Sequence, residues 1–551
     1  MDESKIKRPC NYRKCLFIVF LFMLYTFIFQ KNLCLAQQQD FKERNFLIPD
    51  EIVKNFYLYK ARDITISGIY AGIVRKENNG KYWWLLKGRK KSIYILSKLP
   101  FKLRTQTYTR DIIRTIVIGQ VEIDSSPNIY ILGRYVFYTM PHNSFPQISF
   151  PDDFSPFGAH PCGVHGDDRF FKEYAKMGIS WIRNAGGDGG LVWDIIEPNL
   201  NGRYNWIFFD QRLKISLNKD FKVLVTTKAI NTKDQRLCHR LARGNKYTQY
   251  KVLEYNPCNW HKYEQFLRES IRRYKNKIKY WQIENEPVTG GQYYADTPEN
   301  YAKLLAFSYK IIKHECPKCK VVMAGRPGCT GLAYLIKVLE TLKSFSFCKN
   351  SGCFDIFDIH VGSIIKPAER TEGTYFIYKQ ILNEFGYKQK PIYSTEFGPL
   401  DYSLTDKFKR DPNLEQKIRK VMPSILIKMY ASALAVGYKK LFWRVNEPPS
   451  SIIVMKGNSL EKCPSYYAYK ILIHKLNRLK TAKKIAEGCY KFTLYNGRKL
   501  YILWCNSKTY SLPEEVKKWK KIKVTYYDGR EKIINTSNLK LSSMPIFVEK
   551  E

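Results

Sequence analysis

Eight short apolar runs alternate with helical segments between residues 154 and 480, and this rhythm constrains the fold more than any other feature of the chain. Strands that alternate with helices are typical of parallel sheets, and eight such units predict an α/β protein built on a (β/α)₈ TIM barrel. The runs are FGAHP (157–161), SWIRNA (180–185), KVLVTT (222–227), KYWQIEN (279–285), KVVMAG (320–325), FDIFDIHV (354–361), PIYSTEF (391–397) and KLFWRV (440–445).

Strand patterns of another kind flank the predicted barrel. Residues 41–140 hold five β-type runs separated by turn residues, which predicts a small β-barrel whose strand rhythm resembles an OB-fold. Residues 488–551 return to short strands and predict an appended antiparallel β-module. In KYWWLL (81–86), Trp83 and Trp84 point to opposite faces of a strand. They form either a stacking platform for sugar or nucleotide, or a core residue and its cover.

The first 36 residues have the organisation of an export signal. A positively charged lead precedes the apolar run 16–29, and Cys34-Leu35-Ala36 resembles a cleavage site. The run is shorter than the roughly 20 residues of a membrane-spanning helix. We expect residues 1–36 to be a signal peptide or a membrane anchor. The protein is then exported, and it is periplasmic, extracellular or anchored at the outer face of a membrane.

Eleven cysteines follow the export signal, which fits a protein that forms disulfides. Cys348 and Cys353 bracket a short turn, and Cys489 and Cys505 flank two strand-like runs, so these pairs are the expected bridges. The Cys-Pro-Lys-Cys motif at 316–319 has zinc or redox spacing, but no second pair accompanies it. A local disulfide or buried thiols are its other interpretations. We expect no metal and no organic cofactor.

The net charge of +42 is the second compositional feature that bears on function. Such a charge suits nucleic acid or an anionic surface. The lysines, however, are spread along the whole chain and form no single arm or stripe. We therefore do not expect nucleic acid as a partner, while an acidic polysaccharide or an anionic envelope surface stays open.

Two glutamates stand at the ends of the fourth and seventh runs. YWQIENEP (280–287) places Glu284 and Glu286 on either side of an asparagine, and STEFG (394–398) contains Glu396. In a (β/α)₈ barrel the C-terminal strand ends gather around the mouth, where chemistry takes place. Glu286 and Glu396 could therefore flank a glycosidic bond, about 5 to 5.5 Å apart. Glu284 is expected to point into the barrel interior or to form a salt bridge.

These motifs resemble the acid/base and nucleophile motifs of clan A retaining glycoside hydrolases. The segment at 193–210, which begins WDIIEP, is similar to a loop of enzymes around families 39 and 5, and the resemblance extends over residues 154–551. It implies Glu286 as the acid/base and Glu396 as the nucleophile. It also implies three substrate-site residues, which are Asn285 as a contact to the sugar 2-hydroxyl, Arg183 as a partner of the nucleophile, and Trp443 as a sugar platform.

Two histidines complete the predicted site. Enzymes similar to family 5 often carry His-x-Tyr on the sixth strand, and this chain reads His360-Val361-Gly362. His360 is expected in the site, with a tyrosine from elsewhere in the chain replacing the missing one. His160, on the first strand, either lines the pocket or packs beneath it.

The predicted function is a retaining β-glycosidase that hydrolyses O-glycosidic bonds of an extracellular or envelope oligosaccharide or polysaccharide by double displacement. One alternative is a transglycosidase with the same residues, and another is a carbohydrate-binding pseudoenzyme. A third is an envelope nucleic-acid binder that uses the N-terminal barrel. Membrane contact is expected only through an uncleaved N-terminal segment.

Overall fold

The computed structural model describes residues 47, 49–54, 59, 63–88, 90–98, 114–123, 129–139, 146–185, 189–239, 254–288, 293–326, 331–401, 403–505 and 511–551. The predicted export signal lies outside these residues. No helix in the described ranges combines the length and the apolar character needed to cross a membrane.

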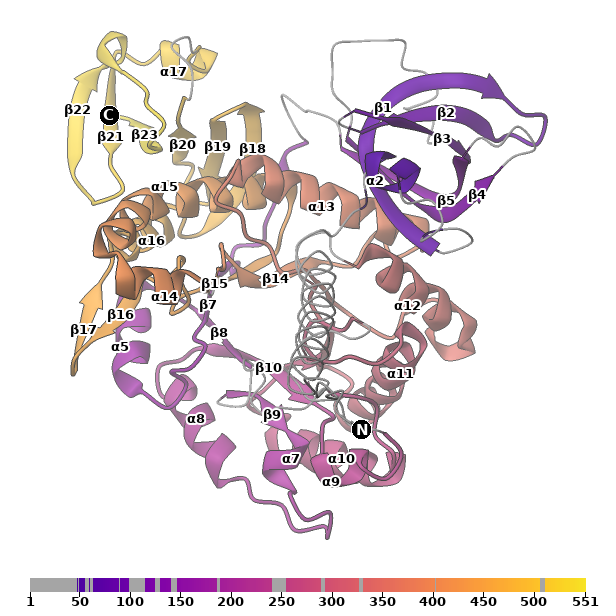
Figure 1. Cartoon of the computed structure of the whole chain (residues 1–551). Helices are drawn as coiled ribbons and strands as arrows, with labels where there is room; N and C mark the ends of the chain where they lie inside the picture. Colours follow the sequence, from indigo (N-terminus) through magenta and orange to yellow (C-terminus); the bar gives the residue numbers. More distant parts are fainter. Residues whose placement is uncertain are drawn as a thin grey trace, which may run out of the picture.

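Eight parallel strands form the central sheet (Figure 1), in the order β12-β11-β10-β8-β7-β15-β14-β13. A bridge between Val322 and Ile356 joins the two end strands, so the sheet closes on itself. The predicted TIM barrel is therefore confirmed. Its strands are β7 (Phe157–His160), β8 (Trp181–Asn184), β10 (Lys222–Lys228), β11 (Tyr280–Ile283), β12 (Lys320–Met323), β13 (Phe357–Asp358), β14 (Ile392–Phe397) and β15 (Lys440–Arg444), and β9 (Leu191–Val192) pairs with β10.

Helices surround this sheet, and local sequence fixes their ends. In α11, the Thr297 side chain accepts a hydrogen bond from the backbone N–H of Asn300, and Pro298 occupies the first helical position. The helices of the barrel region are α5 (Asp168–Met177), α7 (Trp193–Ile196), α8 (Ile207–Leu217), α9 (Thr232–Gln235), α10 (Trp260–Tyr274), α11 (Pro298–Glu315), α12 (Leu332–Ser344), α13 (Pro367–Glu384), α14 (Ser403–Arg410), α15 (Pro412–Val436) and α16 (Pro464–Lys475). A hairpin of β16 (Ile453–Lys456) and β17 (Ser459–Lys462) precedes α16.

The N-terminal part forms a closed five-stranded barrel in the order β1-β2-β3-β5-β4. Trp84, Leu86 and Ile131 are buried inside it. The barrel rests against α12 and α13 (Figure 1). At this contact the Tyr135 hydroxyl donates to Glu340 on α12 at 2.7 Å. Its elements are α2 (Pro49–Lys54), β1 (Asp63–Lys76), β2 (Tyr82–Lys87), β3 (Ser92–Ser97), β4 (Arg114–Ile123) and β5 (Ile129–Thr139).

The C-terminal part is an antiparallel sheet in the order β22-β21-β23-β20-β19-β18-β6. The predicted β-module is thus present, but its sheet also includes two strands that lie outside the predicted range 488–551, β18 (Leu479–Ala486) and β6 (Ile148–Ser149). The other strands are β19 (Cys489–Leu494), β20 (Lys499–Leu503), β21 (Lys521–Thr525), β22 (Glu531–Asn535) and β23 (Ile546–Lys550), with the short helix α17 (Glu514–Lys517) between β20 and β21.

Disulfides join three cysteine pairs among the described residues, namely Cys238–Cys258, Cys316–Cys319 and Cys348–Cys353. The predicted bridge at 348–353 is confirmed, and the motif at 316–319 forms a local disulfide.

The predicted bridge between Cys489 and Cys505 is wrong, because Cys489 carries a free thiol. The antiparallel register places Cys489 opposite Leu503. The backbone N–H of Cys505 instead donates to Ser542. Burial raises the pKa of the Cys489 thiol to about 12, so this thiol is unreactive at neutral pH.

Candidate active site

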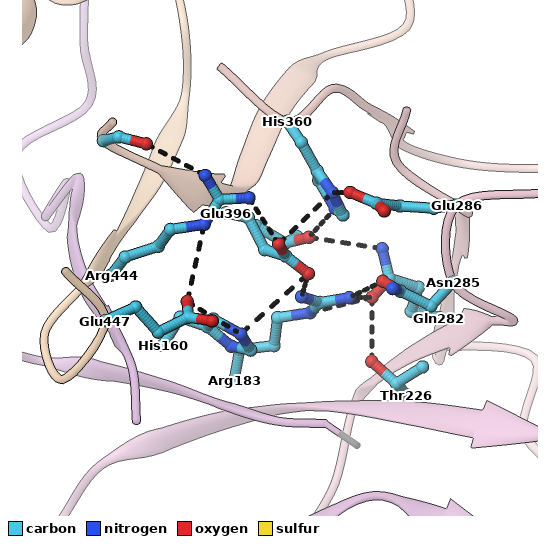
Figure 2. Close-up of polar contacts among 12 residues, drawn as sticks. His160, Arg183, Thr226, Gln282, Asn285, Glu286, His360, Glu396, Arg444 and Glu447 are labelled. Carbon is cyan, nitrogen blue, oxygen red and sulfur yellow. Dashed lines mark hydrogen bonds and ion pairs between the residues drawn. The ribbon is translucent and has the colours of Figure 1, made fainter. Parts of the chain in front are cut away.

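Glu286 and Glu396 face each other at the C-terminal mouth of the barrel (Figure 2). Glu286 stands three residues beyond the end of β11, and Glu396 is the penultimate residue of β14. One oxygen of each carboxylate and one nitrogen of His360 lie within 4.8 Å of one another. The side chain of Glu286 is 17% exposed and that of Glu396 is 10% exposed, so both are largely shielded but neither is sealed from solvent.

Two arginines hold the carboxylate of Glu396. Arg183 Nη1 lies 2.6 Å from Oε1, and Arg444 Nη2 lies 2.6 Å from Oε2. Burial alone raises the pKa of the Glu396 carboxyl, but the positive charges of His360, Arg444 and Arg183 outweigh burial and hold the pKa well below its usual value. Glu396 is therefore a carboxylate at neutral pH, which is the form a nucleophile needs.

His360 contacts both glutamates. Its Nδ1 lies 2.6 Å from Glu286 Oε1 and 3.5 Å from Glu396 Oε2. Burial lowers the pKa of His360, but the charge of Glu396 and hydrogen bonds with Asp358 and Glu286 outweigh it and raise the pKa to about 9. His360 is thus an imidazolium at neutral pH, and its Nδ1–H can donate to Glu286 Oε1.

Arg183 is fully buried and is oriented by two amide side chains. Its Nε and Nη2 donate to Gln282 Oε1 at 3.0 and 2.8 Å, and Nη2 also donates to Asn285 Oδ1 at 2.6 Å (Figure 2). Thr226 Oγ1 donates to the same Gln282 oxygen at 2.8 Å. The guanidinium group of Arg183 therefore fixes the amide oxygen of Asn285 at the edge of the site.

A second set of hydrogen bonds, centred on Asp358 and Thr395, positions His360. Gln282 Nε2 donates to Asp358 Oδ2 at 2.6 Å, and Thr395 donates to Asp358 through its backbone N–H at 2.8 Å and its hydroxyl at 2.5 Å. Thr395 Oγ1 also lies 3.2 Å from His360 Nε2. Gln282 thus connects the arginine beside one glutamate with the histidine beside the other.

His160 lies beside the candidate nucleophile, with its Nε2 3.9 Å from both Glu396 Oε1 and Glu447 Oε2. Burial is the main cause that holds the pKa of His160 well below its usual value, so the imidazole is neutral at pH 7 and these contacts are not ion pairs. Glu447 also lies 3.5 Å from Arg444 Nε, and it adds a third glutamate to the pocket (Figure 2).

Trp443 lies apart from this cluster. It is fully buried, its indole N–H donates to the Ser450 carbonyl at 2.8 Å, and its ring packs against Phe397 and Tyr430. A sugar platform needs an exposed ring face. The structure therefore places Trp443 in the core, and its burial does not support the expected platform role.

Gly362 occupies the position at which similar enzymes carry tyrosine. A Cβ atom there would lie closer than 3.0 Å to the Gly398 carbonyl, so this position has no room for a side chain. Tyr293 is the candidate replacement. Burial and the nearby charges of Glu286 and Glu396 raise the pKa of its phenol, and Lys228 Nζ lies 5.2 Å from its ring centroid.

Glu284 does not join the catalytic pair. It is fully buried, and its Oε1 accepts the backbone N–H of Ala229 at 2.6 Å. Burial and the neighbouring Glu254 raise the pKa of Glu284 well above its usual value, while Lys228 pairs with Glu254 at 2.6 Å. These contacts agree with the expected interior position of Glu284.

The backbone around Asn285 is strained. Glu284 and Glu286 have φ values of 66° and 43°, a left-handed conformation that costs a non-glycine residue about 1–3 kcal/mol. The hydrogen bonds of the Glu284 backbone N–H to Thr227 and of the Glu286 side chain to His360 hold this turn. Strain of this kind is concentrated at functional sites, where it aims side chains.

The sequence alone did not identify Arg444, Gln282, Asp358 or Glu447 as members of the cluster. Gln282 and Arg444 lie on strands already chosen as site strands, so strand alternation could have found both. Asp358 lies two residues before His360, on the same face of its strand. Glu447 follows β15 in a loop and carries no comparable signal.

Glu286, His360 and Glu396 could in principle hold a metal ion. Their charges are already compensated, since Glu396 binds two guanidinium groups and His360 carries a proton. A second trio, Cys238, His239 and Cys258, has its two sulfurs joined in a disulfide. We assign no metal to either set.

The sequence matches no family model and no curated protein. Its fold, however, matches solved structures. A family 39 glycoside hydrolase from the gut symbiont Bacteroides cellulosilyticus WH2 aligns over 88% of this chain and 94% of that chain, with a TM-score of 0.51 and 14% identity. A family 39 β-xylosidase from Caulobacter crescentus aligns over 73% and 97%, with a TM-score of 0.49 and 14% identity. The first of these likenesses shows that the chain shares the fold of that family 39 glycoside hydrolase.

Proposed function

We propose that the protein is a retaining β-glycosidase that hydrolyses O-glycosidic bonds of an extracellular or envelope oligosaccharide or polysaccharide. The observation that carries this proposal is the facing pair Glu286 and Glu396, whose nearest oxygens lie within 4.8 Å. Retaining glycosidases hold their two carboxyl groups about 5–5.5 Å apart, whereas inverting ones need about 6.5–9.5 Å to admit a water molecule. The short separation supports a double displacement.

In the first step, Glu396 attacks the anomeric carbon while the leaving oxygen takes a proton from Glu286. In the second step, Glu286 accepts a proton from water, the water attacks the same carbon, and the bond to Glu396 breaks. Arg183 and Arg444 keep Glu396 ionised before the attack and stabilise its charge again as it leaves.

The contact between His360 and Glu286 supports the acid/base role of Glu286. Nδ1 of His360 lies 2.6 Å from Glu286 Oε1, and the pKa of His360 is raised to about 9, so the imidazolium holds a proton at this contact at neutral pH. A proton that passes along this hydrogen bond to Glu286 is then available to the leaving oxygen.

Substrate contacts come from the side chains around this pair. Arg183 already occupies the Asn285 amide oxygen, so the amide nitrogen is the group that would donate to the sugar 2-hydroxyl. His160, neutral at pH 7, can donate to or accept from a second hydroxyl. Tyr293 takes the role of the tyrosine that Gly362 cannot supply.

The rest of the chain fits an exported glycosidase. The three disulfides support export with residues 1–36 as signal or anchor. The strand order of the N-terminal barrel supports an OB-like domain over 41–140. We place the catalytic barrel at 154–480 and the C-terminal β-module at 488–551.

The roles of the two glutamates are tested by Glu396→Ala and Glu286→Ala on a panel of aryl β-glycosides. Glu396→Ala should abolish all cleavage. Glu286→Ala should lose about 10²- to 10⁴-fold on glycosides with basic leaving groups. It should still react with acidic phenols, and azide should speed its second step because azide needs no base.

Equal loss on both substrate classes, without azide rescue, would refute the acid/base role of Glu286. Transfer to added alcohols in preference to water would identify a transglycosidase. Glycan binding without turnover by the wild type would identify a pseudoenzyme.

A further inference from the structure

The outer wall of the N-terminal barrel carries an aromatic cluster that the proposed reaction does not use. The ring of Trp83 on β2 has its centroid 6.4 Å from that of Tyr94 on β3 and 5.0 Å from that of Tyr130 on β5. The neighbouring residues Trp84 and Ile131 point into the barrel core, so strand alternation directs the three aromatic side chains outward. We call this surface the aromatic face.

The aromatic face is accessible and continuous. Tyr94 is 40% exposed and Trp83 is half-buried. Cross-strand pairing sets Trp83 opposite Leu96, and Tyr94 opposite Leu85 on one side and Tyr130 on the other. Aromatic and leucine side chains thus cover adjacent positions on three strands, and contiguous exposed apolar surface of this kind usually marks a binding site.

Among the described residues, this face does not attach the small barrel to the catalytic barrel. That attachment involves β1, which contacts α12, together with β4 and the second half of β5, where Ile116, Ile118 and Phe137 join the main hydrophobic core and Tyr135 bonds to Glu340. The aromatic face lies on β2, β3 and the first half of β5, so its apolar character has no structural role in that contact.

Two carboxylates and one guanidinium lie beside the rings of the aromatic face. Trp83 Nε1 donates to Glu77 at 2.7 Å, and Arg75 Nη2 donates to the same carboxylate at 2.6 Å. Glu122 stands opposite Tyr130 on β4. A surface that binds nucleic acid needs excess positive charge toward the phosphates. Here carboxylates flank the rings, which disfavours a polyanion and suits a ligand with many hydroxyl groups.

We propose that the aromatic face is an accessory polysaccharide-binding site. Sugar rings stack their C–H faces on this aromatic cluster, in which Arg75 Cζ lies 5.9 Å from the Trp83 ring centroid, and Glu77 and Arg75 hydrogen-bond hydroxyls beside the rings. The choice of a glycan as ligand rests on the proposed function, but the face belongs to a different barrel from Glu286 and Glu396. It would hold the enzyme on a polymer without touching the bond that is cut.

Affinity gel electrophoresis of the full chain tests this proposal. All proteins carry Glu396→Gln so that the polymer is not degraded, and the gels contain xylan, laminarin or hydroxyethyl cellulose. At least one polymer should retard the parent protein. The double variant Trp83→Ala/Tyr94→Ala should raise the apparent dissociation constant at least fivefold. Tyr467→Ala, which removes a tyrosine of similar exposure (47%) from the catalytic part of the chain, should change nothing.

A second readout separates this proposal from the proposed function. With Glu396 intact, Trp83→Ala/Tyr94→Ala should keep kcat/KM for small aryl glycosides within twofold of wild type. Equal retardation of parent and double variant, or no retardation by any polymer, would overturn the accessory site. So would binding of a single-stranded oligonucleotide that the double variant loses. Polymer binding through this face in a wild type without any glycosidase turnover would instead contradict the proposed function alone.

Discussion

At the residue scale, the environment of Glu396 is the most informative part of the molecule. Two guanidinium groups and an imidazolium converge on one buried carboxylate. Burying a carboxylate together with several cationic partners has a large desolvation cost. Groups with strongly perturbed pKa values are concentrated at functional sites. The same environment makes the contribution of each partner measurable.

Arg183→Ala should lower kcat/KM for aryl glycosides by at least about 10²-fold, on the scale of losing one electrostatic stabiliser. The substitution removes a positive charge 2.6 Å from Glu396 and releases Gln282 and Asn285. Arg183→Lys keeps the positive charge but loses the planar guanidinium with its several N–H donors, so it should recover only part of the lost kcat/KM. The surface variant Arg273→Ala is the control. Activity of Arg183→Ala within threefold of wild type would show that Arg444 alone holds the nucleophile.

The raised pKa of His360 predicts a pH-dependent stability. A histidine whose pKa rises from 6.5 unfolded to about 9 folded stabilises the fold fully below pH 6.5, and this contribution is lost as the pH rises through about 9. The difference in free energy of unfolding between wild type and His360→Gln should therefore shrink by ~3 kcal/mol between pH 6 and pH 10. Urea unfolding of both proteins at each pH measures this difference in free energy of unfolding.

The control for this experiment is His314→Gln, because the side chain of His314 is 71% exposed. It should show no such trend. A difference between wild type and His360→Gln that is constant with pH would mean that folding does not raise the pKa of His360.

The pair Trp443 and Arg444 shows that the sequence could locate a strand end but could not predict which of its residues faces the site. The end of the eighth strand was identified correctly as a site position, but adjacent residues on a strand point to opposite sides. Arg444 reaches Glu396, while Trp443 packs against Tyr430 on α15. Periodicity locates a strand end, whereas the face that looks into the mouth depends on how the strand packs in the closed barrel.

At the element scale, the end of β12 must leave space for the side chains that follow β13. A Cβ at Gly325 would lie closer than 3.0 Å to both Asp358 Oδ2 and His360 Nε2. Gly325→Ala should therefore displace His360, lower kcat/KM about tenfold or more, and destabilise the fold by about 1–3 kcal/mol. In the control Gly166→Ala the nearest atom is the mobile end of Arg212 at 3.3 Å. Unchanged kinetics in Gly325→Ala would contradict the packing described here.

The elements that sequence predicted and those that it missed differ in a physical way. All eight barrel strands were predicted, because parallel strands are buried on both faces and appear as continuous apolar runs. β18 was missed because its sequence LKTAKKIA carries three lysines, and β6 because a two-residue strand has no periodicity. Both belong to an antiparallel sheet, in which one face can be polar.

At the scale of the whole molecule, buried ion pairs tie the C-terminal sheet to the barrel. Lys475 on α16 contacts Glu549 on β23 at 2.7 Å, and both side chains are at most 5% exposed. Removing one member of a buried pair costs about 3–5 kcal/mol, because the other charge stays buried. Glu531 also contacts Lys475, at 3.0 Å, and offsets part of that cost.

Glu549→Ala should therefore lower the free energy of unfolding by about 2–4 kcal/mol. Glu514→Ala, which breaks an exposed pair with Lys517, should change it much less, because solvent screens that pair. Chemical denaturation followed by tryptophan fluorescence compares the two variants. Equal effects would show that the sheet is not anchored through this pair.

The stereochemistry of the first product tests the central claim most directly. If Glu396 forms a covalent intermediate that water then hydrolyses from the same side, the first sugar released from an aryl β-glycoside is the β-anomer, before mutarotation. Proton NMR recorded during the first minutes of the reaction distinguishes the two anomers. A first product in the β configuration agrees with the facing pair Glu286 and Glu396 acting as acid/base and nucleophile, and an α-anomer as first product would contradict it.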